Sequence, residues 1–189
     1  MHKPGAHGHR FGNIERLRAP ERIERLEVGR VVDLVLDGIH PHTTLDIGTG
    51  SGIFAEEFAR RGLTVAGVDA NARMLHSARG YVPGGFFLQA IAEGIPLADN
   101  AFGVVFLGLV LHETDDLLRA MQEARRVAQA RVAVLEWPYQ AEEFGPGLEE
   151  RLRQEDMEQF GKQAGLGPIE VFPLQKLMLY RWDKRDKHR

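Results

Sequence analysis

A glycine-rich turn with an acid at its start is the segment of this sequence best suited to bind a ligand. It reads Asp46-Ile47-Gly48-Thr49-Gly50-Ser51-Gly52 and overlaps the end of an apolar, β-branched run, Thr43 to Ile47, that predicts a strand. A helical pattern begins at Ile53. Glycines in such a strand–turn–helix unit let a ligand approach the backbone, and the first helical turn presents free N–H groups. The segment therefore predicts a small-molecule site.

A second acid follows at the end of the next predicted strand. Asp69 closes the run that starts at Thr64 and comes 17 residues after Gly52. A carboxylate at that place can accept hydrogen bonds from both ribose hydroxyls of an adenosine-containing ligand. The two acids and the turn together predict a site for such a ligand.

The spacing of the glycines distinguishes between two kinds of adenosine-containing ligand, a dinucleotide and a ligand without phosphates. A dinucleotide-binding turn reads G-x-G-x-x-G, whereas here the third glycine comes one position early and Ile53 stands where glycine is expected. Asp46 would be poorly placed beside a pyrophosphate, but it could pair with the ammonium group of a methionine moiety. We therefore predict S-adenosylmethionine (SAM) as the ligand. The alternative is a tight turn that binds nothing, which the two acids disfavour.

The elements that must position these residues alternate between short apolar runs and helical patterns. The predicted strands are 43–47, 64–69, 86–89, 104–108, 131–136, 169–172 and 176–182. The predicted helices are Pro20 to Gly38, Ile53 to Arg61, Asn71 to about Ala78, one capped by Thr114 or Asp115, and one ending at Gly165. Three residues join the last two strands, which permits only antiparallel pairing. We predict an α/β fold, a doubly wound and mostly parallel sheet that ends in an antiparallel hairpin.

Composition narrows the class of protein. The chain has 189 residues, 43% hydrophobic and 27% charged, which predicts one globular domain over 1–189 with an arm or lid at 1–19 and a polar tail at 183–189. A net charge of −3 disfavours nucleic acid and anionic membranes as partners. The absence of cysteine excludes disulfides, thiolate zinc sites and a cysteine nucleophile. No apolar run is long enough for a bilayer span or a leader, so we expect a cytoplasmic protein.

Several segments resemble the class I SAM-dependent methyltransferases, and within them the type 11 group akin to the ubiquinone- and menaquinone-biosynthesis methyltransferases. The segments that carry the resemblance are 45–55, 68–75, 92–102 and 109–113, and it extends over about 9–182. It implies a Rossmann-like sheet of seven strands with the last strand antiparallel. It also implies SAM as the cofactor and transfer of its methyl group to a small-molecule acceptor.

The resemblance also assigns residues to parts of the cofactor. It gives Asp46, Gly48, Thr49 and Gly50 to the methionine end, Asp69 to the ribose, Ala70 and Met74 to the flanks of the adenine, Ile91 and Ala92 to its edge, and Leu107 to the closure of the pocket from the fourth strand. Ile91 departs from the pattern, since many relatives have an acid there for the adenine amino group. We therefore expect that contact to come from the backbone.

The acceptor side of the site is less well marked. His112 follows the fourth predicted strand, and an imidazole can take up a proton near neutral pH, so it is the candidate general base. A histidine that caps the next helix or packs under a loop is the alternative. Trp137 and Phe11 are candidate walls of the acceptor pocket, with ordinary packing as the alternative. The histidines near the N-terminus, His2, His7 and His9, have no nearby carboxylate, and we predict no metal site.

Two other functions keep the glycine turn. A SAM-binding sensor or partner subunit would need no open acceptor pocket and no transferase activity. A nucleotide-dependent oxidoreductase would need the other glycine spacing, so the sequence disfavours it. The segment after the fourth strand, L-G-L-V-L-H-E, also lacks the Asn/Asp-Pro-Pro-Tyr pattern of methyltransferases that act on exocyclic amines of bases or on glutamine.

Overall fold

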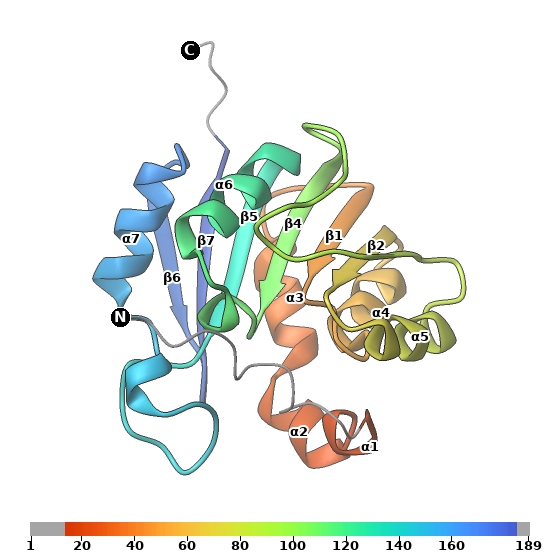
Figure 1. Cartoon of the computed structure of the whole chain (residues 1–189), viewed down its shortest axis with the longest axis horizontal. Coiled ribbons are helices and arrows are strands. Elements are labelled where there is room, and N and C mark those ends of the chain that lie inside the picture. Colours follow the sequence, from red (N-terminus) through yellow and green to blue (C-terminus); the bar gives the residue numbers. More distant parts are fainter. Residues whose placement is uncertain (1–13, 185–189) are drawn as a thin grey trace.

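A computed structural model describes residues 14–184, and within them seven strands form one sheet. The strand order is β3-β2-β1-β4-β5-β7-β6 (Figure 1). The strands are β1 (Thr43–Ile47), β2 (Thr64–Asp69), β3 (Phe86–Gln89), β4 (Phe102–Gly108), β5 (Ala128–Glu136), β6 (Ile169–Pro173) and β7 (Met178–Asp183). β1 to β5 run parallel to one another, and β7 pairs antiparallel with both β5 and β6. The predicted fold class and the terminal hairpin are confirmed.

Helices cover both faces of the sheet. They are α1 (Ile14–Leu17), α2 (Pro20–Arg25), α3 (Val28–Leu36), α4 (Ile53–Arg60), α5 (Ala72–Tyr81), α6 (Leu117–Val127) and α7 (Gln154–Gln163), with short 3₁₀ helices η2 (Leu111–Glu113) and η3 (Leu148–Glu150). α6 and α7 pack on one face, and α3, α4 and α5 pack on the other. No helix in the described part of the chain is both long and apolar enough to cross a membrane.

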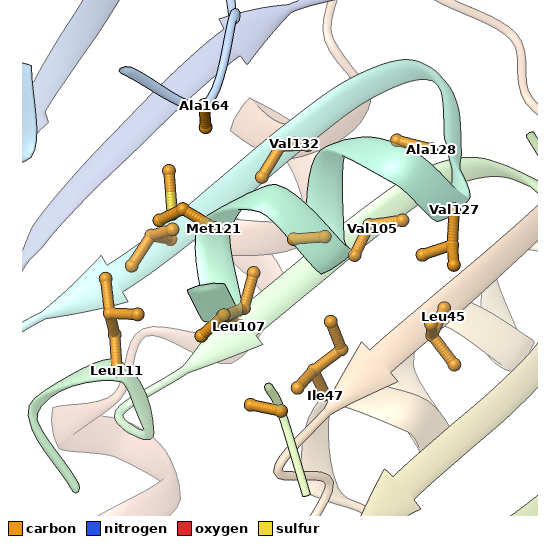
Figure 2. Close-up of a cluster of buried hydrophobic side chains, with 14 of the residues drawn as sticks. Leu45, Ile47, Val105, Leu107, Leu111, Met121, Val127, Ala128, Val132 and Ala164 are labelled. Atoms are coloured by element: carbon orange, nitrogen blue, oxygen red, sulfur yellow. The ribbon is translucent and has the colours of Figure 1, made fainter. Parts of the chain in front are cut away.

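The core has two layers because alternate residues of each strand point to opposite faces. On the α6 side, Leu45, Leu107 and Met121 are fully buried (Figure 2). On the α4 side, the rings of Phe54 and Phe106 lie 4.8 Å apart between centroids. Burial of these apolar side chains fixes the register of the strands, and the register fixes which strand ends meet.

Besides α5, which ends at Tyr81 rather than at about Ala78, two helices differ from the prediction. The helix expected from Pro20 to Gly38 is broken at Glu27, whose φ of 47° is left-handed. The Glu27 carboxylate accepts the N–H of Gln175 from the β6–β7 turn at 2.7 Å, so the break ties the helix pair to that turn. The helix expected to be capped by Thr114 or Asp115 is capped by Asp116.

The second difference has a local cause. Residues 111–113 form a 3₁₀ turn, and the Thr114 hydroxyl donates to the Leu111 carbonyl at 2.7 Å. The cap therefore moves to Asp116, whose side chain accepts the N–H of Arg119 at 2.9 Å.

The carboxyl ends of the central strands meet at one edge of the sheet. Ile47 pairs with Val68 on one side and with Leu107 on the other. In Figure 1 the arrowhead of β4 points toward this edge, where α1, α2 and the loop after β5 also gather. Ligands of doubly wound sheets bind at such an edge, where the strand order reverses.

Candidate functional site

The turn between β1 and α4 is built on three left-handed glycines. Gly48, Gly50 and Gly52 have φ values of 67°, 52° and 80°. The N–H of Thr49 donates to the Val68 carbonyl at 3.0 Å, which holds the turn against the end of β2. Residues other than glycine rarely adopt these φ values, so the backbone conformation of the turn requires glycine at these three positions.

The first two glycines serve different purposes. A Cβ atom on Gly48 would lie 2.4 Å from Cγ2 of Val110, because the segment after β4 packs directly on the turn. A Cβ atom on Gly50 would meet nothing closer than the Gly48 carbonyl at 3.9 Å. Gly48 therefore allows the protein to pack, whereas Gly50 leaves its backbone open to a ligand.

Asp46 is a buried carboxylic acid beneath this turn, with 2% of its surface exposed. The Thr49 hydroxyl donates to its Oδ2 at 2.7 Å. Burial raises the pKa of Asp46 to about 7, with the nearby Asp69 adding to the rise and the Thr49 hydrogen bond opposing it. Within residues 14–184 no cationic side chain pairs with Asp46. A buried carboxylate of this kind fits the ammonium group of a ligand.

Asp69 is held in place by the backbone on both of its oxygens. Gly50 N–H donates to Oδ2 and Asn71 N–H donates to Oδ1, both at 2.8 Å. Burial raises the pKa of Asp69, and these two N–H groups act against that rise. The structure thus joins the turn after β1 directly to the acid after β2, and the carboxylate is fixed before any ligand arrives.

The remaining residues assigned to the cofactor lie around the ends of β2, β3 and β4 with different exposures. Ala70 is exposed, and its carbonyl accepts from the Gln89 side chain at 2.8 Å. Ile91 is 57% exposed. Met74, Ala92 and Leu107 are buried, and Leu107 has no exposed surface at all. Leu107 therefore supports the strand ends from within the core (Figure 2).

The N-terminal arm reaches the glycine turn through Arg18, which the sequence did not single out. Its guanidinium donates to the Ser51 carbonyl at 2.9 Å and pairs with Glu56. It also lies 3.4 Å from the ring centroid of Tyr81 on α5. The segment 14–19 is therefore fastened to the turn, while the predicted pocket residue Phe11 and the histidines at positions 2, 7 and 9 lie outside the described residues.

His112 lies in η2, just beyond β4, and makes a short hydrogen bond to the end of β5. Its Nδ1 is 2.8 Å from Oε2 of Glu136, a carboxylate with 2% of its surface exposed. Two backbone N–H groups, of His112 and of Trp137, donate to the same carboxylate at 3.3 Å. Glu136 is not among the residues predicted from the sequence. Its signal was an acid at the end of a buried strand, the same signal that marks Asp69.

The surroundings of His112 are acidic. Burial is the largest single influence and lowers the pKa of His112, but the carboxylates of Glu136, Glu113 and Glu150 together outweigh it. The pKa of His112 is therefore raised above its ordinary value. Nε2 lies 3.9 Å from Glu113.

The loop after β5 wraps around a buried arginine. Arg151 is 5% exposed and donates to backbone carbonyls of the loop, those of Pro138, Gln140, Phe144 and Pro146. Trp137 is half-buried within this loop, against Gly145 and near the Arg151 guanidinium. An open groove of about 480 Å³ lies beside the loop, lined by Pro138, Tyr139, Arg153, Gln154, Glu155, Met178 and Tyr180.

In the described part of the chain, no three acidic or histidine side chains are arranged to hold a metal ion.

Comparison with known sequences gives a consistent family. Residues 45–134 match the family model described as "Methyltransferase domain". A demethylmenaquinone methyltransferase of Thermotoga maritima is 31% identical over 111 residues, which are 57% of this chain and 48% of that protein. An uncharacterized methyltransferase of Mycobacterium sp. is 34% identical over 54% of this chain and 41% of its own length. The chain spans about half or less of these curated relatives.

Comparison with solved structures gives the same fold. A SAM-dependent methyltransferase from Aquifex aeolicus superposes with a TM-score of 0.75 at 22% identity, over 90% of this chain and 96% of that one. A possible histamine N-methyltransferase from Thermotoga maritima gives a TM-score of 0.69 at 20% identity, over 90% and 98% of the two chains. The matched domain and the sequence relatives make residues 45–134 similar to the class I SAM-dependent methyltransferases of type 11, whose cofactor is SAM, and the solved structures show that the chain has their fold.

Proposed function

We propose that this chain is an enzyme that transfers the methyl group of SAM to a small-molecule acceptor. The observation that carries the proposal is the linked pair of acids at the strand ends. Asp46 is buried without a cation among the described residues, and Asp69 is held by the N–H of Gly50. A positively charged, adenosine-containing ligand satisfies both acids, whereas a pyrophosphate would be repelled by them.

The proposed roles follow from this geometry. Asp46 takes the ammonium group of the methionine end, and Gly48, Thr49 and Gly50 provide the backbone beside it. Asp69 accepts from the ribose hydroxyls. The adenine lies near a set of residues at the ends of β2 and β3 and on α5: Ala70, Met74, Ile91 and Ala92. Leu107 supports the strand ends from within the core. SAM supplies an electrophilic methyl group when bound, so the protein's task is to orient the acceptor and exclude water.

The acceptor side supports a small molecule. An open groove of about 480 Å³ lies beside the loop after β5, and its size is one that small ligands occupy, although neither His112 nor Trp137 is in its lining. A net charge of −3 gives no attraction to nucleic acid. His112 is the proposed base, and Trp137 and Phe11 are the proposed walls. The names of two relatives, a demethylmenaquinone methyltransferase and a malonyl-[acyl-carrier protein] O-methyltransferase, describe acceptors of those proteins and agree with this class. A cytoplasmic location is part of the proposal.

The test is a transfer assay that follows S-adenosylhomocysteine while a library of small metabolites is offered as acceptors. Product should form with at least one acceptor, and Asp69→Ala should reduce kcat/KM. The matched control is Asp33→Ala, which removes an exposed acid that pairs with Arg61, at the end of α4 opposite the turn. Tight SAM binding without transfer to any acceptor would instead support the alternative, a SAM-binding module.

A further inference from the structure

We propose that Glu136 is a positioning residue that holds His112 ready to take a proton from the acceptor, and that the acceptor is therefore an oxygen or carbon acid. The proposal rests on the proposed function, since it concerns the acceptor half of the same site. It adds a residue that the sequence did not mark and a chemical class for the acceptor.

The contacts of Glu136 show what its carboxylate does. It is almost wholly buried at the end of β5, and it accepts from His112 Nδ1 at 2.8 Å and from the N–H groups of His112 and Trp137 at 3.3 Å. Within residues 14–184 no lysine or arginine forms an ion pair with it. A buried carboxylate needs compensation, and here the compensating side chain is the imidazole. The pairing joins residues 24 apart in the chain.

This contact selects one tautomer of the neutral imidazole. Because the carboxylate accepts at Nδ1, the proton of the neutral ring stays there and Nε2 keeps its lone pair. Nε2 is thus the atom able to take up a proton. Uptake places a positive charge directly beside a carboxylate that is already aligned, so little reorganisation is needed.

The other charged groups around the ring favour the same step. Glu113 on η2 lies 3.9 Å from Nε2, and Glu150 on η3 also acts on His112. On β7 the buried Tyr180 is a further titratable group, and the charge of Glu136 acts on it. Burial and the negative charges of Glu136 and Glu155 raise the pKa of Tyr180 to about 12, so this group stays neutral. Every charged neighbour of His112 named here is acidic and stabilises the imidazolium form.

The chemistry that uses such a base is limited. A neutral amine already has the electron pair with which it attacks a methyl group, whereas a phenol, an enol or a carbon acid gains its pair by losing a proton. His112 Nε2 takes that proton as the O–H or C–H bond breaks. The electron pair left on the acceptor forms the new bond to the methyl carbon, and the electrons of the methyl–sulfur bond neutralise the sulfonium. The proton then passes from His112 to water.

The decisive test is an NMR titration of the full chain without acceptor, with His112 assigned through His112→Gln. We expect neutral His112 to carry its proton on Nδ1 and its pKa to lie above the ordinary value of a histidine side chain. Glu136→Gln should lower the pKa of His112 by about 1–3 units, because the facing charge is lost. A proton on Nε2, or a pKa that Glu136→Gln leaves unchanged, would overturn the positioning role.

Activity then tests the acceptor class. Catechol, 2,4-pentanedione and benzylamine are offered together with SAM labelled with ¹³C in the methyl group. We expect product from catechol or the dicarbonyl, a large loss in kcat for His112→Gln, and a shift of the acidic limb of the pH profile to lower pH in Glu136→Gln. Product from the amine alone, or from none of the three, contradicts the acceptor class.

Binding of S-adenosylhomocysteine separates this proposal from the proposed function. If both variants and the control His40→Gln bind it as the wild type does while the titration fails, only the dyad is wrong. If the wild type does not bind it, the proposed function fails first.

Discussion

The two halves of the candidate site are built in different ways. The polar part of the cofactor half occupies seven consecutive residues, Asp46 to Gly52, together with Asp69, and its geometry is set by backbone angles and backbone N–H groups. The acceptor half consists of side chains that are distant in the chain, with His112 paired to Glu136 and Arg151 holding a loop. A site made of backbone is fixed by local sequence, whereas a site made of side chains depends on which strands become neighbours.

The largest expected effect tests the close packing of the glycine turn in the cofactor half. Gly48→Ala forces a Cβ atom to within 2.4 Å of Val110 at a left-handed backbone position. The strain and the overlap together should lower the free energy of unfolding by about 2–5 kcal/mol. Gly50→Ala, with open space around it, should cost only about 1–2 kcal/mol. Urea denaturation measures both, and equal losses would contradict the assignment of packing to one glycine and access to the other.

The second prediction concerns pH and Asp46. Its pKa in the folded protein, about 7, lies above the ordinary value of 3.8, so the folded state holds the proton more tightly than the unfolded state. Stability of the ligand-free protein should therefore fall as pH rises from about 4 through 7, and Asp46→Asn should remove that fall. As the pH rises from about 5 to about 8, the unfolding free energy of the variant should therefore increase by roughly 2–4 kcal/mol relative to that of the wild type.

The same substitution, although it stabilises the ligand-free protein, should weaken ligand binding. Asp46→Asn removes the charge that pairs with the ammonium group, so affinity for S-adenosylhomocysteine should drop at every pH. In the wild type, that affinity should decline below about pH 7 as Asp46 takes up its proton. If the variant is more stable and still binds S-adenosylhomocysteine with the affinity of the wild type, Asp46 does not contact the ligand.

The third prediction tests whether the loop of the acceptor half can be destabilised without a change in cofactor affinity. Arg151→Met leaves several loop carbonyls without their donor and should cost about 1.5–3 kcal/mol in the free energy of unfolding, measured with urea. Affinity for S-adenosylhomocysteine should change by less than about twofold. Arg153→Met, an exposed neighbour, is the control and should cost under about 0.5 kcal/mol. A large loss of cofactor affinity in Arg151→Met would mean that the two halves are coupled.

The same difference between local and long-range contacts explains which parts of the fold could be predicted from the sequence. The strands, their parallel arrangement and the terminal hairpin follow from apolar runs and short connections. The break at Glu27 does not, because its partner Gln175 is 148 residues away. The shifted cap at Asp116 depends on a 3₁₀ turn that no periodicity marks.

The site shows the same division. The glycine turn, Asp46 and Asp69 are legible because backbone conformation and strand ends leave a local pattern. His112 could be named from its residue type and position, but its partner Glu136 could be named only once β4 and β5 were adjacent. Arg151, a buried arginine that pairs with carbonyls, has no sequence signature.

The most direct test of the central claim is calorimetry of the wild type and of Asp69→Ala with S-adenosylhomocysteine, SAM and NAD. We expect the wild type to bind both sulfur ligands and not NAD. Asp69→Ala should weaken the binding of S-adenosylhomocysteine by about 1–3 kcal/mol, or roughly 5- to 150-fold, through the loss of the ribose contact. Binding of NAD without either sulfur ligand, or equal affinity in wild type and variant, would contradict the account.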